Sequence, residues 1–240
     1  MPTQAPIQLE TQTPSLAAIR QRIAEAEARF NRPPGSVILL AVSKRRTPSE
    51  ILTIVSQGQQ QFAESYLQEA LPKIQTLAGH DLEWHFIGKV QSNKTEEIAH
   101  YFDWIHTIER DKIARRLNDQ RPESLPPLNA LIQVNIDEEP TKSGVLLPEL
   151  PGLLERVGRY PRLRLRGLMT LPAPSKDFAS QRRAFQRLAR AFAEFRDQGI
   201  PLDTLSMGTS DDFEAAIAEG ATMVRIGTAI FGPRKGSRVE

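Results

Sequence analysis

The 240-residue sequence contains no cysteine, which excludes disulfides, thiolate metal sites and a cysteine nucleophile. It also lacks a long hydrophobic run, since no apolar stretch approaches the roughly 18–20 residues that span a bilayer. An excess of charge is missing as well, because 31 Lys and Arg face 29 Asp and Glu and leave a formal net charge of +2. Nucleic-acid binding requires a concentrated basic stripe, so we expect neither a membrane nor a nucleic-acid partner.

The N-terminal residues have neither the basic start nor the apolar stretch of a secretory signal, and we therefore expect a cytoplasmic location. Residues 1–13 are polar and rich in Pro, Thr and Gln, which predicts a flexible tail before one domain over residues 14–240. With 40% hydrophobic and 25% charged residues, the chain has ordinary globular composition. Its length suits one α/β barrel of roughly 250 residues.

Short apolar runs alternate with helical patterns after the tail. The run VILLAVS (37–43) is rich in β-branched residues without polar alternation, as expected for a strand buried on both faces. The predicted strands are 37–43, 60–64, 82–87, 104–107, 128–135, 163–169, 202–207 and 223–227. The predicted helices are 15–30, a segment from Pro48, 66–78, 93–100, 109–120, 148–159, 177–198 and 211–219.

Eight strands that alternate with helices predict a single-domain (β/α)₈ TIM barrel with an additional N-terminal helix. An open, doubly wound sheet is the alternative, but such sheets usually carry fewer strands and a glycine-rich first turn. The sequence contains no G-x-G-x-x-G motif and no Walker lysine loop. A functional site is therefore expected at the carboxyl ends of the strands.

Two strand ends suit a phosphate group. The segment Ser206–Ser210 follows the seventh predicted strand, and Gly227 and Thr228 follow the eighth. We expect Ser210 to cap a helix that begins at residue 211, whose first N–H groups attract an anion. The simpler alternative is that Ser210 only caps this helix and that Gly227 only turns the chain. Both loops together, opposite Lys44, favour a phosphate site.

Lys44 follows the first predicted strand directly and is followed by Arg45 and Arg46. One interpretation is a solvated basic turn between a strand and a helix. The other is an amine at the barrel mouth, partly desolvated and near other cations, which favours the neutral nucleophile that forms an imine with an aldehyde.

Arg225 lies within the apolar eighth strand, where an unpaired guanidinium would be strongly unfavourable. It therefore needs hydrogen-bond acceptors, an aromatic nitrogen or a structural ion pair, for which Glu64 and Asp211 are candidates. The histidines do not form a set of metal ligands, and His85 and His106 fall on predicted strands, where we expect core positions.

Six motifs, in order along the chain, resemble those of the pyridoxal 5′-phosphate (PLP) homeostasis proteins. These are single-domain relatives of the alanine-racemase-type barrel that binds PLP (fold type III). The motifs are AVSK (41–44), WHFIGKVQSNK (84–94), QVNIDEEPTKSGV (133–145), RGLMTLP (166–172), LSMGTSDDFEAAIAEG (205–220) and MVRIGTAIFG (223–232). The last two together are highly specific, whereas AVSK alone would be a weak signal.

The resemblance implies that PLP is the cofactor, held as a Schiff base on Lys44, with its phosphate at the last two motifs. It also implies that Arg225 faces the pyridine nitrogen, where a guanidinium disfavours protonation and makes the ring a poor electron sink. The function implied is PLP homeostasis and amino-acid/keto-acid balance without catalytic turnover. The implied cofactor-binding residues are Lys44, Ser65, Ser206, Ser210, Arg225, Gly227 and Thr228.

The chain departs from the family pattern at several positions. It reads Ala63-Glu64-Ser65 where G-E-N is usual, and Thr209 stands where the family has a methionine. Lys89 and Val90 replace the commoner His-Leu. We expect these changes to weaken PLP affinity, since Ser65 is shorter than asparagine and lacks an amide.

Two other functions are alternatives. A small fold type III PLP enzyme with racemase activity would need a base, but the racemase relatives take a tyrosine from a second domain. The tyrosines here, Tyr66, Tyr101 and Tyr160, lie in predicted helices or loops. A barrel enzyme for a phosphorylated sugar, or an RNA-binding module, would bind phosphate without an imine. We expect a monomer with no catalytic residues and no metal, whose partners are PLP and PLP-dependent apoenzymes.

Overall fold

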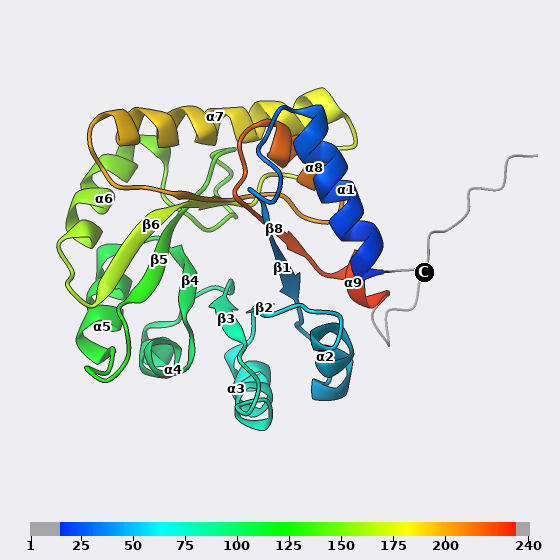
Figure 1. Ribbon diagram of the computed structural model, residues 1–240. Helices are drawn as coiled ribbons and strands as arrows, with labels where there is room; N and C mark the ends of the chain where they lie inside the picture. The colour runs from blue at the N-terminus through cyan, green and yellow to red at the C-terminus, as the bar shows by residue number, and fades with distance from the viewer. Residues whose placement is uncertain (1–14, 234–240) are drawn as a thin grey trace, which may run out of the picture.

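The computed structural model describes residues 15–233, in which eight parallel strands close into one barrel in the sequential order β1 to β8 (Figure 1). The strands are β1 Ile38–Val42, β2 Gln61–Glu64, β3 Glu83–Phe86, β4 Trp104–Ile108, β5 Leu128–Val134, β6 Leu163–Thr170, β7 Thr204–Ser206 and β8 Met223–Ile226. The sheet closes where Ile38–Ala41 of β1 pair with Met223–Ile226 of β8.

Helices surround the barrel (Figure 1). They are α1 Leu16–Arg29, α2 Pro48–Val55, α3 Leu67–Thr76, α4 Thr95–Tyr101, α5 Asp111–Gln120, α6 Leu150–Gly158, α7 Phe178–Asp197, α8 Phe213–Ala218 and α9 Thr228–Phe231. Two 3₁₀ turns, η1 Ser92–Lys94 and η2 Leu147–Glu149, precede α4 and α6. Within residues 15–233, no helix has the length and apolarity needed to cross a membrane.

The predicted barrel with its N-terminal helix is confirmed, and the strand and helix limits agree within a few residues. Local signals explain the agreement: Thr47 and Glu50 form a capping box at the start of α2, and Gly199 follows α7 with a φ of +88°. The short helix α9 was not predicted from the sequence. The predicted tail over residues 1–13 lies outside the described residues.

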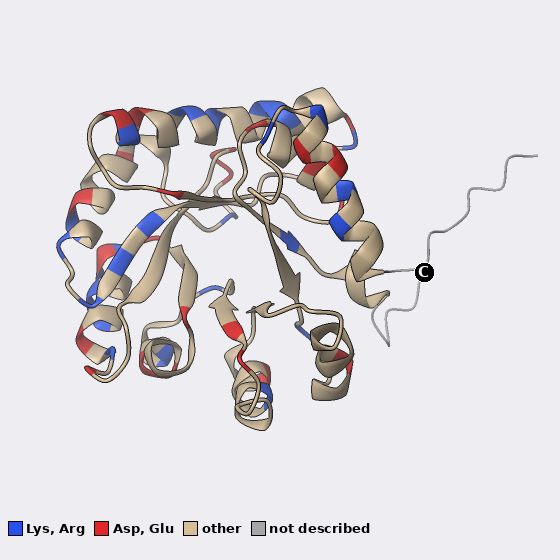
Figure 2. Cartoon of the chain, in the orientation of Figure 1, with Lys and Arg blue, Asp and Glu red and all other residues tan. Residues whose placement is uncertain are grey.

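Apolar side chains of the helices and the outer strand faces form one large core cluster between the two layers. The barrel interior holds two small apolar clusters, Leu40–Ala63–Met223 and Trp104–Leu131–Met169. Polar side chains occupy other interior positions and are also buried. Acidic and basic residues are interspersed over the surrounding helices, in keeping with the balanced charge (Figure 2).

Candidate functional site

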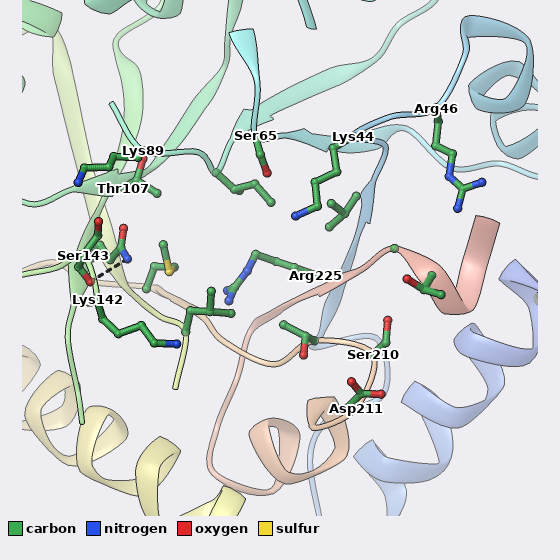
Figure 3. Close-up of a pocket in the computed structure, with 18 of the residues that line it drawn as sticks. Lys44, Arg46, Ser65, Lys89, Thr107, Lys142, Ser143, Ser210, Asp211 and Arg225 are labelled. Atoms are coloured by element: carbon green, nitrogen blue, oxygen red, sulfur yellow. Dashed lines mark hydrogen bonds between the residues drawn. The ribbon is translucent and has the colours of Figure 1, made fainter. Parts of the chain in front are cut away.

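A cavity of about 580 Å³ lies at the carboxyl ends of the strands. This volume is typical of small-molecule sites. Lys44 from the end of β1 and Arg225 from β8 both point into it (Figure 3). Six of the seven predicted site residues line this cavity: Lys44, Ser65, Ser210, Arg225, Gly227 and Thr228.

Ser206 is the seventh predicted residue, and it is buried behind Arg225 instead of lining the cavity. Its hydroxyl oxygen lies 2.8 Å from Arg225 Nη1, which donates to it, and 2.9 Å from His106 Nδ1. Ser206 therefore holds the guanidinium that reaches the cavity.

Arg225 is buried and donates twice, from Nη1 to Ser206 and from Nη2 to the carbonyl of Thr170 at 2.9 Å. Burial lowers the pKa of Arg225 to about 10, while the charge of Asp212 acts in the opposite sense. The guanidinium thus stays protonated at neutral pH and is a donor only. The ion pair considered for Arg225 with Glu64 is wrong, because Glu64 is bound to Lys73.

The chain turns sharply at Lys44. The next residue, Arg45, has a φ of +61°, and its N–H donates to Glu69 on α3 at 2.9 Å. A left-handed backbone at a non-glycine residue is strained and is found where surrounding contacts enforce it. The turn sets Lys44 at the rim of the cavity, where its side chain is half-buried.

A buried ion pair fixes the strand end beneath Lys44. Lys73 Nζ lies 2.8 Å from Glu64 Oε1 and donates to the carbonyl of Ser43 at 2.9 Å, and the Ser43 hydroxyl donates to the same Glu64 oxygen at 2.6 Å. Burial raises the pKa of Glu64, and the charge of Lys73 opposes this shift. Glu64 and Ser43 therefore support the end of β1 and do not reach the ligand space.

The loop after β7 forms one wall. The prediction that Ser210 caps a helix starting at 211 is wrong, since α8 begins at Phe213 with Asp212 as its N-cap. The Asp212 carboxylate accepts from the Thr209 N–H and from the Thr209 hydroxyl at 2.9 Å, which ties residues 209–212 into a turn. Ser210 is therefore left to face the cavity, as Figure 3 shows.

Glycines let the backbone close around this wall. Gly208 has a φ of +96°, and a Cβ there would lie 2.9 Å from Phe213 Cα. A Cβ on Gly227 would meet the Val42 carbonyl oxygen at 3.3 Å, so the end of β8 lies close to the end of β1. Thr228 follows as the first residue of α9. Lys44 and the Gly227–Thr228 turn consequently belong to neighbouring strands of the barrel.

The opposite wall comes from β4 and from two loops, and the sequence analysis did not assign these residues to the site. It contains Lys89 and Thr107, and also Lys142 and Ser143 from the loop after β5. That loop folds back through Gly144, which has a φ of +120° and donates its N–H to Glu109 Oε2 at 3.1 Å. The motifs WHFIGKVQSNK and QVNIDEEPTKSGV contain Lys89, Lys142 and Ser143, but loop positions give no periodic signal for their direction.

The cavity is electropositive. Its cationic lining residues are Lys44, Arg46, Lys89, Lys142 and Arg225, and the lining drawn from residues 15–233 includes one acidic side chain, Asp211. An amine, a donor-only guanidinium, two hydroxyls and a close backbone turn suit an anionic ligand that carries a carbonyl. Among the described residues, no cluster of three or more His, Asp or Glu could hold a metal ion.

Among known protein families, residues 15–235 match the family described as alanine racemase, N-terminal domain. The chain is 52% identical over 227 residues to the pyridoxal phosphate homeostasis protein of Escherichia coli (strain K12), covering 93% of this chain and 97% of that protein. The protein of the same name from Pseudomonas aeruginosa is 50% identical over 226 residues, covering 94% and 97%.

The chain is also similar to solved structures. PipY of Synechococcus elongatus, with PLP bound, matches with a TM-score of 0.78 and 34% identity over 88% of this chain and 100% of that one. The alanine racemase of Corynebacterium glutamicum matches with a TM-score of 0.65 over 94% of this chain and 63% of that one. Its identity is 19%, so this likeness concerns the fold alone.

Proposed function

This chain belongs to the alanine racemase N-terminal domain family, and on that premise we propose that it binds PLP and serves PLP homeostasis. The observation that carries the proposal is that an amine, Lys44, and a turn with one hydroxyl, Gly227–Thr228, line one cavity with the buried Arg225. PLP supplies an aldehyde, which condenses with an amine, together with a phosphate and a basic ring nitrogen.

Each part of the cavity suits one part of this cofactor. Lys44 is the amine for the Schiff base. The hydroxyls of Ser210 and Thr228 and the backbone at Gly227 offer hydrogen bonds to the phosphate. The cationic lining, with Arg46 among its members, favours the phosphate charge. Ser65 lies on the wall next to Lys44 and contributes a hydroxyl where the family has an amide.

Arg225 supports binding without turnover. Its guanidinium is charged at neutral pH and has no lone pair to accept a proton, so with PLP bound it would donate to the ring nitrogen and disfavour protonation of that nitrogen. Within the described residues, no tyrosine lines the cavity. Tyr66 and Tyr101 are exposed, and Tyr160 donates to Asp111 at 2.9 Å. The protein therefore holds PLP and does not act as a racemase.

Finer parts of the proposal concern partners and location. We propose that the protein is a cytoplasmic monomer that receives PLP and delivers it to PLP-dependent apoenzymes. The exposed rim of the cavity, formed by Lys89, Lys142 and Thr228, leaves a route for the cofactor to enter and leave. Light scattering of the purified protein tests the monomer, and a mass near twice 26.9 kDa would contradict it.

Titration with PLP followed by borohydride reduction tests the binding proposal. The wild type should gain the visible absorption of an imine and then a permanent mass increase after reduction. The Lys44→Ala variant should show neither, while Lys112→Ala, which changes a lysine outside the cavity lining, should behave as wild type. Imine absorption and labelling of the Lys44→Ala variant equal to those of the wild type would overturn the assignment of Lys44 as the Schiff-base lysine.

A further inference from the structure

A chain of polar side chains crosses the barrel interior behind the cavity. It runs from Arg225 on β8 to Ser206 on β7, then to His106 on β4, His85 on β3 and Glu83, the first residue of β3. The distances are 2.8 Å (Arg225 Nη1 to Ser206 Oγ), 2.9 Å (Ser206 Oγ to His106 Nδ1), 3.0 Å (His106 Nε2 to His85 Nδ1) and 2.8 Å (His85 Nε2 to Glu83 Oε1).

The chain connects the two ends of the barrel. Arg225 lines the cavity at the carboxyl ends of the strands, whereas the Glu83 side chain is 41% exposed at the amino-terminal end of β3. Between them, His85, His106 and Ser206 have no exposed surface. The His85 ring stacks on Trp104 at a centroid distance of 5.3 Å and an angle of 14°, which restricts its orientation.

The protons on these links have one consistent direction. An ionised Glu83 only accepts, so His85 carries its proton on Nε2 and offers Nδ1 as an acceptor. His106 must then donate from Nε2, and its Nδ1 accepts from the Ser206 hydroxyl. The Ser206 oxygen accepts in turn from Arg225. Every buried polar atom on this path thus has a partner, and every donor points toward Glu83.

The protonation states agree with this direction. Burial lowers the pKa of His85 and lowers that of His106 well below its usual value, so both rings are neutral at neutral pH. The hydrogen bond from His85 lowers the pKa of Glu83, which is therefore ionised. The other charged groups that act on members of the chain are Asp103, which acts on His85, Arg166, which acts on Glu83, and Asp212, which acts on Arg225.

We propose that Glu83, His85, His106 and Ser206, here called the axial chain, position the Arg225 guanidinium toward the cofactor from the opposite end of the barrel. The inference rests on the proposed function, because the contact that the chain controls is the one between Arg225 and the ring nitrogen of PLP. His85 and His106 are positioning residues, since neither lines the cavity.

The direction of the chain determines what Ser206 offers to Arg225. With the Ser206 proton donated to His106, the oxygen lone pairs are available to the guanidinium, and the carboxylate at the far end strengthens each link. If the direction of these hydrogen bonds were reversed, His106 Nδ1 would donate to Ser206 as well. The serine oxygen would then receive two donors, and its hold on Arg225 would weaken.

Nitrogen-15 NMR of the histidine rings, recorded without PLP, tests the direction of the axial chain. In the wild type, both His85 and His106 should carry their proton on Nε2. Glu83→Gln should keep this pattern because the amide oxygen still accepts. Glu83→Leu should move both protons to Nδ1, since the buried His85 Nε2–H would otherwise have no acceptor.

The dissociation constant of PLP tests the positioning role. Glu83→Leu should raise it by about 2- to 30-fold, the usual range for a substitution that acts through a contact network, whereas Glu83→Gln should change it less than twofold. Glu97→Leu, which removes a glutamate of α4 from its ion pair with Lys94 of η1, is the matched control and should alter neither readout. If Glu83→Leu does not fold, His85→Phe should move the His106 proton to Nδ1 and weaken PLP binding similarly.

Two results would overturn the inference. One is a wild-type protein with either ring protonated on Nδ1. The other is a Glu83→Leu protein whose PLP affinity equals that of the wild type, whether or not the ring protons have moved. A wild type that shows the predicted ring protons but fails to bind PLP would instead refute the proposed function, so the two failures are distinguishable.

Discussion

Two buried polar clusters lie beside the cavity, and they differ in whether the cationic group that each one binds reaches the cavity. The cluster of Ser43, Glu64 and Lys73 closes on itself, because the lysine charge is bound by the glutamate and by a backbone carbonyl. The axial chain instead holds Arg225 through Ser206, and the charge of Arg225 reaches the cavity. The first cluster stabilises a strand end, and the second presents a charge to a ligand. A buried serine and a glutamate therefore have different roles in the two clusters, according to whether the cation that the cluster binds, Lys73 or Arg225, reaches the cavity.

The largest effect is expected from a substitution that breaks the first cluster. Glu64→Ala removes the buried carboxylate 2.8 Å from the Lys73 ammonium and leaves it the more distant Glu69 carboxylate at 3.9 Å, which should lower the free energy of unfolding by about 3–5 kcal/mol. Urea unfolding followed by circular dichroism measures this loss. Replacing both partners, as in Glu64→Leu with Lys73→Met, should cost less than the single change. A single variant as stable as the wild type would contradict the structural role of the pair.

Breaking the second cluster should affect binding more than folding. Ser206→Ala removes an acceptor of Arg225, and hydrogen bonds to charged groups of this kind correspond to about a 10- to 100-fold change in an equilibrium constant. Absorption titration should show PLP binding weakened by this factor. Thr204→Ser, on the same strand, keeps its hydroxyl and should bind PLP as the wild type does. Equal affinities of the Ser206→Ala variant and the wild type would refute the link between Ser206 and the cofactor.

The histidines of the axial chain should make stability depend on pH. Their pKa values are lowered in the folded state, so below about pH 6.5 the unfolded chain binds protons that the folded protein does not. Stability is therefore full above pH 6.5 and falls on acidification, and we expect a loss of about 1–2 kcal/mol between pH 6.5 and 5.5.

Urea unfolding at pH 7.5, 6.5 and 5.5 measures this dependence, and His106→Gln should reduce it. His100→Gln changes an exposed histidine on α4 and is the matched control, which should retain the wild-type dependence. A His106→Gln protein with the full wild-type dependence would show that His106 is not neutral in the folded state.

The smallest expected effect concerns a departure from the family pattern. Ser65→Asn restores the longer amide at the end of β2, where Ser65 lines the cavity. One added hydrogen bond should tighten PLP binding by about 2- to 10-fold. Ala63→Gly, at a buried interior position of β2, reverses a second departure and should leave the affinity unchanged. Weaker binding by Ser65→Asn would show that the cavity does not accommodate the family amide.

The barrel could be predicted because strands and helices leave periodic signals. The run at 37–43 and the predicted helix at 177–198 correspond to β1 and α7. The strand-end rule also predicted Lys44 and Gly227 at one end of the barrel, where both line the cavity, whereas a place for Arg225 at the ligand was implied by the family resemblance.

The local chemistry of the loops could not be predicted in the same way. Asp212, and not Ser210, is the N-cap of α8, and its carboxylate is bound by Thr209, a contact that no periodicity encodes. The partners of Glu64 and of Ser206 come from α3 and β8, and such pairings depend on the closed barrel. Lys142 reaches the cavity through a loop that turns at Gly144, which the sequence marks only as a glycine.

A crystal structure of the protein reduced with borohydride in the presence of PLP tests the central claim most directly. The account predicts continuous density from Lys44 Nζ to the pyridoxal ring, with the phosphate at Ser210 and Gly227–Thr228 and the ring nitrogen at Arg225. Density attached to Lys89 or Lys142, or a phosphate on the far wall of the cavity, would contradict it.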